Sequence, residues 1–138
     1  MAEPVRATLV DSNVLLDLIT EDRNWLDWSA GALAEAADYG ALVINAVIYS
    51  EVSIGFSRIE ELDAKLPPDA FLRAHLPWAA AFLAGKCFRD YRSRGGTRRS
   101  PLPDFFIGAH AAVADLRLLT RDAGCYRSYF PKLRLVAP

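Results

Sequence analysis

The chain has 138 residues, of which 52% are hydrophobic and 24% are charged, and these values exclude an intrinsically disordered protein and suit one packed domain over residues 1–138. The net charge of −1 by itself points to no class of partner, but residues 1–70 hold 4 Lys and Arg against 13 Asp and Glu, whereas residues 71–138 hold 12 against 4. This asymmetry indicates either a surface for a polyanion or two halves that pair with each other or with a second subunit.

Two further features bear on where the protein works. Cys87 and Cys125 have no CxxC partner, which argues against a disulfide framework or a zinc site and fits a reducing cytoplasm. The first residues, MAEPVRA, lack the layout of a signal peptide, and apolar stretches such as Leu76 to Gly85 are too short for a membrane span. We therefore expect a cytoplasmic protein with no membrane partner.

The first predicted element is a strand over Val5 to Val10, because this run is apolar without polar alternation, as in strands covered on both faces. Asp11, Ser12 and Asn13 follow, and their side chains suit the start of a helix that reaches Leu18. Asp11 therefore lies where a buried strand ends. Ligands collect at that edge of an open α/β sheet.

The rest of the chain alternates helices with short apolar strands. In the first half of the chain we predict a helix from Glu21 to Gly40, a strand over Ala41–Ile44, a helix over Ala46–Lys65 capped by Asn45, and a short segment over Asp69–His75 capped by Asp69. In the second half we predict a helix from Pro77 to about Arg94, a loop over 95–102, a helix over Asp104–Asp115 and a strand over Leu116–Thr120. The tail from Tyr126 is predicted to hold one turn of helix, followed by a strand over Leu133–Val136. This order predicts an α/β fold, with a parallel sheet between helices.

Four acidic residues occupy comparable places in these elements: Asp11, Glu51, Asp104 and Asp122. Each one alone is more commonly a helix cap, a turn residue or a paired charge. At one sheet edge, however, two carboxylates ~4 Å apart repel by about 4 kcal/mol at an effective dielectric constant of ~20. Such a group should bind a hard cation, and oxygen ligands favour Mg²⁺ or Mn²⁺.

Four stretches carry a resemblance to a known family. They are LVDSNVLLDL around Asp11, NAVIYSEVSIGF around Glu51, LPDFFIGAHAAV around Asp104, and LLTRDAGCYRSYFPKLRLVAP around Asp122. In this order and spacing the chain resembles PIN-domain ribonucleases, specifically VapC-type toxins of type II toxin–antitoxin pairs, over nearly its whole length. The resemblance implies a three-layer α/β/α sandwich with a central parallel sheet. It also implies metal-dependent cleavage of RNA at an acidic cluster.

The resemblance also implies roles for single residues. The acidic quartet, Asp11, Glu51, Asp104 and Asp122, matches the catalytic and metal-binding acids of the family. We expect Asp11 and Asp104 to be direct ligands of Mg²⁺, or of Mn²⁺, and Glu51 and Asp122 to hold metal-bound waters or a second ion. Water activated by the metal then cleaves the phosphodiester bond.

Three supporting residues follow from the same match. Asn13 corresponds to the asparagine that helps to position the first aspartate. Ser12 keeps a hydroxyl group where the family often has threonine. Thr120 corresponds to a hydroxyl residue that orders the cluster, although it is equally well explained as a hydroxyl at a strand end.

A basic arm over residues 86–99 holds six Lys and Arg against one acid, Asp90, and runs directly toward Asp104. A polyanion brought to an acidic cluster needs cations around that cluster, so the arm is predicted to bind RNA, with Tyr91 as a stacking surface. The candidate RNA-binding residues are Lys86, Arg89, Arg92, Arg98 and Arg99. The alternative interpretation is a solvated helix face followed by a loop.

The resemblance further implies a homodimer and a cognate antitoxin, a small DNA-binding protein, that covers the active site. The acidic helices between Glu21 and Asp63 offer a groove for it. Two other functions compete with this one. A haloacid-dehalogenase-like phosphatase needs a second acid where Asn13 stands, and a non-catalytic PIN-like RNA- or protein-binding module would normally have lost part of the quartet. The sequence leaves transfer, ribosomal and messenger RNA all open as substrates, and one or two metal ions.

Overall fold

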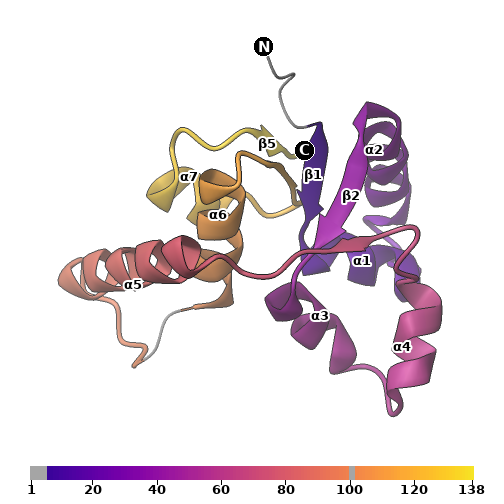
Figure 1. Cartoon of the computed structure of the whole chain (residues 1–138), viewed down its shortest axis with the longest axis horizontal. Helices are drawn as coiled ribbons and strands as arrows, with labels where there is room; N and C mark the ends of the chain where they lie inside the picture. The colour runs from indigo at the N-terminus through magenta and orange to yellow at the C-terminus, as the bar shows by residue number, and fades with distance from the viewer. Residues whose placement is uncertain (1–5, 100–101) are drawn as a thin grey trace.

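The computed structural model describes residues 6–99 and 102–138 (Figure 1). A five-stranded sheet lies at its centre, with every strand parallel to its neighbours in the order β3-β2-β1-β4-β5. The strands are β1 (Ala7–Val10), β2 (Ala41–Ile44), β3 (Leu72–Arg73), β4 (Arg117–Leu119) and β5 (Leu135–Val136). The predicted parallel sheet is therefore confirmed. Val5, the expected first residue of β1, and residues 100–101 of the expected loop lie outside the described residues.

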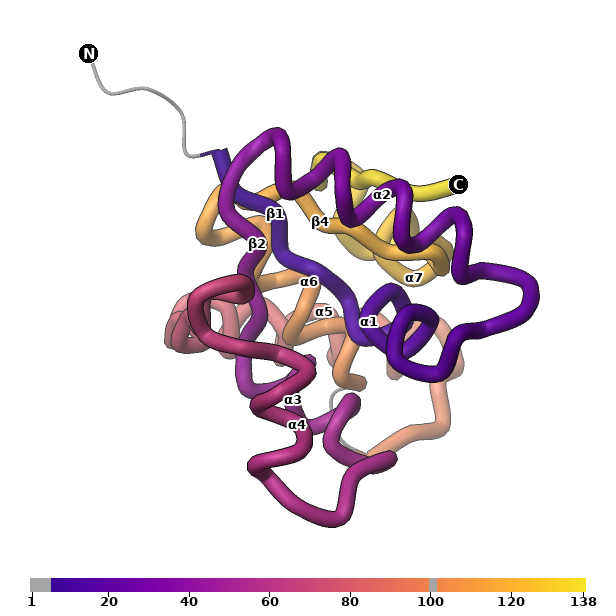
Figure 2. Tube along the Cα trace, turned by 90° about the vertical axis from the view of Figure 1, so that its right-hand side faces the viewer, coloured from indigo at the N-terminus to yellow at the C-terminus, as the bar shows by residue number. Residues whose placement is uncertain are grey.

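Seven helices surround this sheet in the described part of the chain. They are α1 (Ser12–Ile19), α2 (Leu26–Tyr39), α3 (Ala46–Ser53), α4 (Ile59–Lys65), α5 (Trp78–Ser93), α6 (Pro103–Val113) and α7 (Gly124–Tyr129). Figure 2, like Figure 1, places α2 on one face of the sheet and α6 on the other, with α5 packed against α6. This is the predicted three-layer α/β/α arrangement. Among the described residues, no helix combines the length and the apolar character needed to cross a membrane.

Strand β1 occupies the position that creates the site. Its residues are buried on both faces, with Leu9 and Val10 fully inaccessible to solvent, as expected for a central parallel strand. Its neighbours β2 and β4 lie on opposite sides, so the chain leaves β1 toward one side of the sheet and later returns to the other. The carboxyl end of β1 is thus a topological switch point, where side chains from several loops converge.

The predicted helices differ from the structure most at two places, besides α6, which ends at Val113 rather than at Asp115, and α7, which begins at Gly124 rather than at Tyr126. Helix α2 begins at Leu26 rather than at Glu21, because Glu21 adopts a left-handed backbone (φ 52°) and the Asp22 carboxylate accepts hydrogen bonds from two following amides. The predicted helix over residues 46–65 is two helices, α3 and α4. The Ser53 hydroxyl donates to a carbonyl of the preceding turn and Gly55 follows, and both features weaken a helix.

The segment over Asp69–His75 is also different from the prediction, since it contains a strand. Leu72 and Arg73 pair in parallel with Val43 and Ile44 of β2 and form one edge of the sheet. Two residues carry too little sequence pattern to identify a strand. The hydrogen-bonding edge of β2, which only the folded chain supplies, decides their conformation.

Candidate functional site

Asp11 is the residue on which the site is centred. Its backbone N–H donates to the carbonyl of Leu119 at 2.9 Å, which joins the ends of β1 and β4. Its side chain is 3% exposed and caps α1, with Oδ1 accepting the Ser12 N–H at 2.7 Å. Oδ2 accepts hydrogen bonds from the Thr120 hydroxyl at 2.9 Å and from the Tyr126 hydroxyl at 2.8 Å. The carboxylate is therefore fixed by donors on both oxygens, as a buried charge requires.

Asn13 and Thr120 form a short relay toward Asp11. The Asn13 side-chain amide donates to Oγ1 of Thr120 at 3.0 Å, and the Thr120 hydroxyl donates in turn to Asp11. The Asn13 carbonyl oxygen accepts the backbone N–H of Arg121 at 3.2 Å. The structure thus brings both predicted supporting residues to the first aspartate, and it gives Thr120 a contact beyond that of a strand-end hydroxyl.

Asp104 reaches the same place from the first turn of α6. Its Oδ1 lies 3.3 Å from the hydroxyl oxygen of Tyr126, so one phenol contacts the carboxylates of Asp11 and Asp104. Tyr126 lies on α7 and is fully buried. Sequence reasoning missed this residue. The available signal was its position one helical turn after Asp122, at the start of the predicted tail helix.

Glu51 joins the group through Ser12. The Ser12 hydroxyl donates to Oε1 of Glu51 at 3.1 Å, while its backbone N–H donates to Asp11. The Glu51 side chain is half-buried on α3, and this helix is positioned by Asn45, whose side chain accepts the Ile48 N–H at 2.9 Å. Ser12 therefore links two acids from helices that lie far apart in the sequence.

Asp122 lies at the rim of the group and is exposed. Its backbone N–H and carbonyl both lie near the Thr120 hydroxyl, at 3.2 and 3.3 Å. Its charge contributes, after burial and the charge of Asp11, to raising the pKa of Asp104. All four residues of the quartet thus converge on the carboxyl edge of the sheet, with Asp122 the most open to solvent.

Burial and neighbouring negative charges raise the pKa values of three acids of the quartet. Burial raises the pKa of Asp104 to about 6, and the charges of Asp11 and Asp122 add to the increase. Burial also raises the pKa of Asp11, against the opposing effect of its hydrogen bonds from Tyr126 and Thr120. The pKa of Glu51 is raised by burial and by the charges of Asp11 and Asp104. Raised pKa values at several neighbouring carboxylates in one place are typical of a functional site.

The donors of the quartet suit a hard divalent cation, because all of them are carboxylate oxygens. The spacing of these carboxylates does not form a complete metal site. Among residues 6–99 and 102–138, no three acidic, histidine or cysteine side chains are close enough together to hold one metal ion. The Tyr126 hydroxyl lies between Asp11 and Asp104, so a shared ion would need to displace it or shift the carboxylates. The donor chemistry of the site fits a hard cation, whereas the spacing of the described side chains does not by itself form a metal site.

The basic arm lies along α5 and the loop that follows it. Its candidate RNA-binding residues are all exposed: Lys86, Arg89, Arg92, Arg98 and Arg99. The Arg92 guanidinium donates to the carbonyl of Arg98 at 2.8 Å, which folds the loop back onto the helix. Because α5 packs against α6, the arm adjoins the helix that carries Asp104.

Tyr91 has a different environment from the one expected of an RNA-stacking surface. Its ring stacks on Phe88 and contacts the edge of Phe105, with centroid distances of 5.9 Å in both cases. Its hydroxyl oxygen accepts the backbone N–H groups of Thr97 and Arg98. Tyr91 is therefore engaged within the protein, where it anchors the loop of the basic arm.

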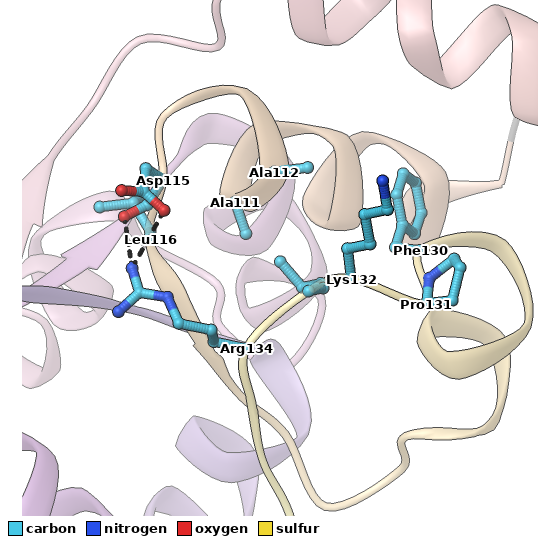
Figure 3. A pocket seen from close by; sticks show the side chains of 9 residues that line it. Ala111, Ala112, Asp115, Leu116, Phe130, Pro131, Lys132 and Arg134 are labelled. Atoms are coloured by element: carbon cyan, nitrogen blue, oxygen red, sulfur yellow. Dashed lines mark hydrogen bonds and ion pairs between the residues drawn. The ribbon is translucent and has the colours of Figure 1, made fainter.

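A hollow of about 490 Å³ lies near the amino ends of β4 and β5, at the end of the sheet opposite to the quartet (Figure 3). It is lined by the end of α6 and by residues 130–134, just before β5 begins. Arg134 crosses one side and pairs with Asp115 at 3.2 Å. None of the quartet lines this hollow, so size alone does not locate the chemistry in this protein.

Comparison with known proteins gives one family and a set of similar folds. The sequence model of the PIN-domain family (PIN domain) matches residues 8–131. Similar solved structures include VapBC2 from Rickettsia felis bound to a promoter DNA fragment (TM-score 0.72, 16% identity, 96% of this chain and 98% of that chain), VapBC-1 from nontypeable Haemophilus influenzae (0.70, 16%, 95% and 97%) and a toxin–antitoxin complex from Klebsiella pneumoniae (0.66, 21%, 94% and 95%). No individual curated protein matches the chain in sequence.

Proposed function

Because this chain belongs to the PIN-domain family, we propose that it is an Mg²⁺-dependent endoribonuclease, the toxin of a toxin–antitoxin pair. The observation that carries this proposal is the convergence of Asp11, Glu51 and Asp104 through the hydroxyl groups of Ser12 and Tyr126. These acids come from three separate elements, and their pKa values are all raised. A purely structural role would not require three buried or half-buried acids at one sheet edge.

The residues have distinct roles in this proposal. Asp11 and Asp104 hold the metal ion, and Glu51 and Asp122 hold its waters or a second ion. A bound Mg²⁺ would lower the pKa of a water molecule and would stabilise negative charge on the phosphoryl oxygens. Thr120 and Ser12 orient Asp11 by donating hydrogen bonds to its two carboxylate oxygens.

The substrate is proposed to be RNA held by the exposed cations of the basic arm. Arg98 and Arg99 lie just before α6, whose first turn carries Asp104. Cations here offset the repulsion between the phosphate backbone and the quartet. Mn²⁺ is expected to replace Mg²⁺, because both ions prefer carboxylate oxygens.

Two partners are also proposed. A cognate antitoxin, a small DNA-binding protein, is expected to cover the quartet by docking on α3 and α4, where Ile54 and Ile59 are 87% and 61% exposed. A second copy of the chain is expected on α5, where Trp78 and Phe82 are 91% and 69% exposed. Large apolar side chains with this exposure are typical of interaction surfaces. The likeness to solved VapBC structures supports the antitoxin partner.

The test of the proposed activity is cleavage of a labelled single-stranded RNA by the purified chain with Mg²⁺, with Mn²⁺ and with EDTA. Asp11→Asn is expected to lower the cleavage rate by about a hundredfold or more, since even residues that only orient a metal ligand contribute ten- to hundredfold. Asp115→Asn is the matched control, because Asp115 lies at the opposite end of the sheet, and it should cleave at the native rate.

The outcomes separate the two candidate functions. Metal-dependent cleavage that disappears in Asp11→Asn supports the nuclease. Equal cleavage by the native and Asp11→Asn proteins contradicts the assignment of the site. Tight RNA binding without cleavage under any of the three conditions would instead favour a PIN-like binding module. Sequencing the 5′ ends of the fragments then identifies which RNA is cut.

A further inference from the structure

An ion pair between the half-buried Arg121 and the buried Asp17 adjoins the quartet without belonging to it. Nε of Arg121 lies 2.8 Å from Oδ2 of Asp17, and the Ser29 hydroxyl donates to the same oxygen at 2.7 Å. The side chain of Asp17 is 2% exposed and that of Arg121 is 30% exposed. Asp17 lies on α1, Ser29 on α2 and Arg121 in the loop after β4. The pair therefore ties together three elements around the site.

Arg121 is also held by contacts outside the ion pair. Its guanidinium carbon lies 5.4 Å from the centre of the Trp25 ring. Its backbone N–H donates to the side-chain carbonyl of Asn13 at 3.2 Å. An arginine that is stacked and hydrogen-bonded in this way has a single preferred position, unlike an exposed arginine.

The place of Arg121 in the sequence makes that position important. It stands between Thr120, which donates to Asp11, and Asp122, which is part of the quartet. The charge of Asp22, and after it that of the adjacent Asp122, acts on its guanidinium in the same direction as that of Asp17. The Asp22 carboxylate is already engaged, because it accepts the backbone N–H groups of Asn24 and Trp25. Among the described residues, Asp122 makes no ion pair of its own. A guanidinium released by Asp17 would find Asp122 as a partner.

The burial of Asp17 explains why Arg121 prefers it. A carboxylate removed from water interacts more strongly with a cation than an exposed one does, and leaving it unpaired is costly. Asp122 is exposed and offers a weaker partner. A carboxylate that is paired with arginine is a poorer metal ligand, because the metal ion must displace the guanidinium first.

We propose that Asp17 is a positioning residue that holds Arg121 away from Asp122 and so keeps the acidic quartet free of an internal cation. This inference rests on the proposed function, because it concerns how well the site takes up a divalent ion. Asp17 contacts neither the metal ion nor the substrate in this arrangement. It acts through the place that it gives to Arg121.

The test is a double-mutant comparison of Mn²⁺ affinity in the full chain, measured by isothermal titration calorimetry. Asp17→Asn is expected to raise the Kd for Mn²⁺ about tenfold, because the released guanidinium competes for the same carboxylate. Arg121→Gln alone should stay within about threefold of the native Kd, and the Asp17→Asn/Arg121→Gln protein should return to the same range. A merely structural role for Asp17 predicts no such rescue.

Asp115→Asn is the matched control, since it removes a carboxylate that pairs with Arg134 far from the quartet and should leave the Kd unchanged. Asp17→Ser removes the same charge with a smaller side chain, and it is a second route to the comparison if the asparagine variant does not fold. A double variant that keeps the full loss of affinity, or an Asp17→Asn protein with the native Kd, would overturn the proposal.

A second measurement does not depend on metal binding. In a crystal structure of Asp17→Asn without metal, we expect the Arg121 guanidinium within about 4 Å of the Asp122 carboxylate, the usual limit of an ion pair. A guanidinium that remains over Trp25, or that pairs with Asp22, contradicts the inference. If the native protein binds no Mn²⁺, the proposed function is wrong, and the position of Arg121 in this variant still decides the inference.

Discussion

The hydroxyl oxygen of Tyr126 lies 2.8 Å from Oδ2 of Asp11, and this contact connects the last helix of the chain with the end of its first strand. The same oxygen lies 3.3 Å from Oδ1 of Asp104. A phenol donates only one hydrogen, so the shorter contact to Asp11 is its principal hydrogen bond. Tyr126 therefore fixes the geometry of the two acids that we propose as metal ligands.

Tyr126→Phe is expected to lower the free energy of unfolding by about 1–3 kcal/mol, because it removes a buried hydrogen bond to a charged group. Urea unfolding at pH 7 measures the change. Tyr129→Phe is the control, because Tyr129 lies on the same helix and its ring packs on Phe105, but its hydroxyl makes no hydrogen bond within residues 6–99 and 102–138. Equal effects of the two substitutions would show that the contact to Asp11 contributes nothing.

The raised pKa of Asp104 predicts how metal-free stability depends on pH. Its pKa rises from an ordinary value near 3.8 to about 6 on folding, so the folded protein binds more protons between these values. Stability contributed by the protonated form is present at pH 4 and is lost as the pH rises through 6. Asp104→Asn removes this loss. We expect it to be more stable than the native protein at pH 8, by about 1–3 kcal/mol.

Urea unfolding in EDTA at pH 4.5 and pH 8 tests this dependence. The advantage of Asp104→Asn should shrink toward acid pH, since native Asp104 is then protonated and its carboxyl group can donate to the Tyr126 oxygen. An advantage that stays constant or grows on acidification would contradict the assignment. Asp90→Asn, on the exposed side of α5, provides the comparison for a surface aspartate.

Mg²⁺ is expected to stabilise the fold through the quartet. A ligand present at 100 times its Kd stabilises the native state by about 2.7 kcal/mol. Thermal unfolding with and without Mg²⁺ should therefore show a higher Tm with the ion at pH 8 and a smaller increase at pH 5, where protons compete for Asp104 and Glu51. Asp11→Asn should show no increase. An increase that survives in this variant would place the bound ion elsewhere.

The basic arm is expected to contribute to RNA binding by charge. In the catalytically inactive Asp11→Asn protein, changing Arg98 and Arg99 together to Glu should weaken the binding of single-stranded RNA. The slope of log K against log[salt] should become shallower by about 1.4, because each phosphate contact to a single strand contributes about 0.7. Fluorescence anisotropy over a range of salt concentrations measures both effects.

A charge-matched control for the arm changes Arg58 and Lys132 together to Glu. Both residues are exposed, and they lie on the loop before α4 and beside the hollow at the opposite end of the sheet. This variant should keep the native salt slope. If the two double variants behave alike, net charge rather than the basic arm governs RNA binding.

The sequence by itself determined the parallel sheet, the three layers and the places of the quartet. An apolar strand that ends in Asp11-Ser12-Asn13 has few alternatives, because the preceding residues must be buried and these side chains must cap the following helix. The same local logic identified Asn45 as a cap and Glu51 as an acid in apolar surroundings.

The tertiary structure alone decided the contacts between segments. Strand β3 forms because it pairs with the free side of β2. Helices α3 and α4 are separate, although the sequence pattern predicts one continuous helix. Tyr126 reaches Asp11 across 115 residues of sequence, and Arg121 reaches Asp17 across 104. Helix starts and buried strands are encoded by neighbouring residues, whereas the partner of a phenol or a guanidinium depends on which distant chain segment folds beside it.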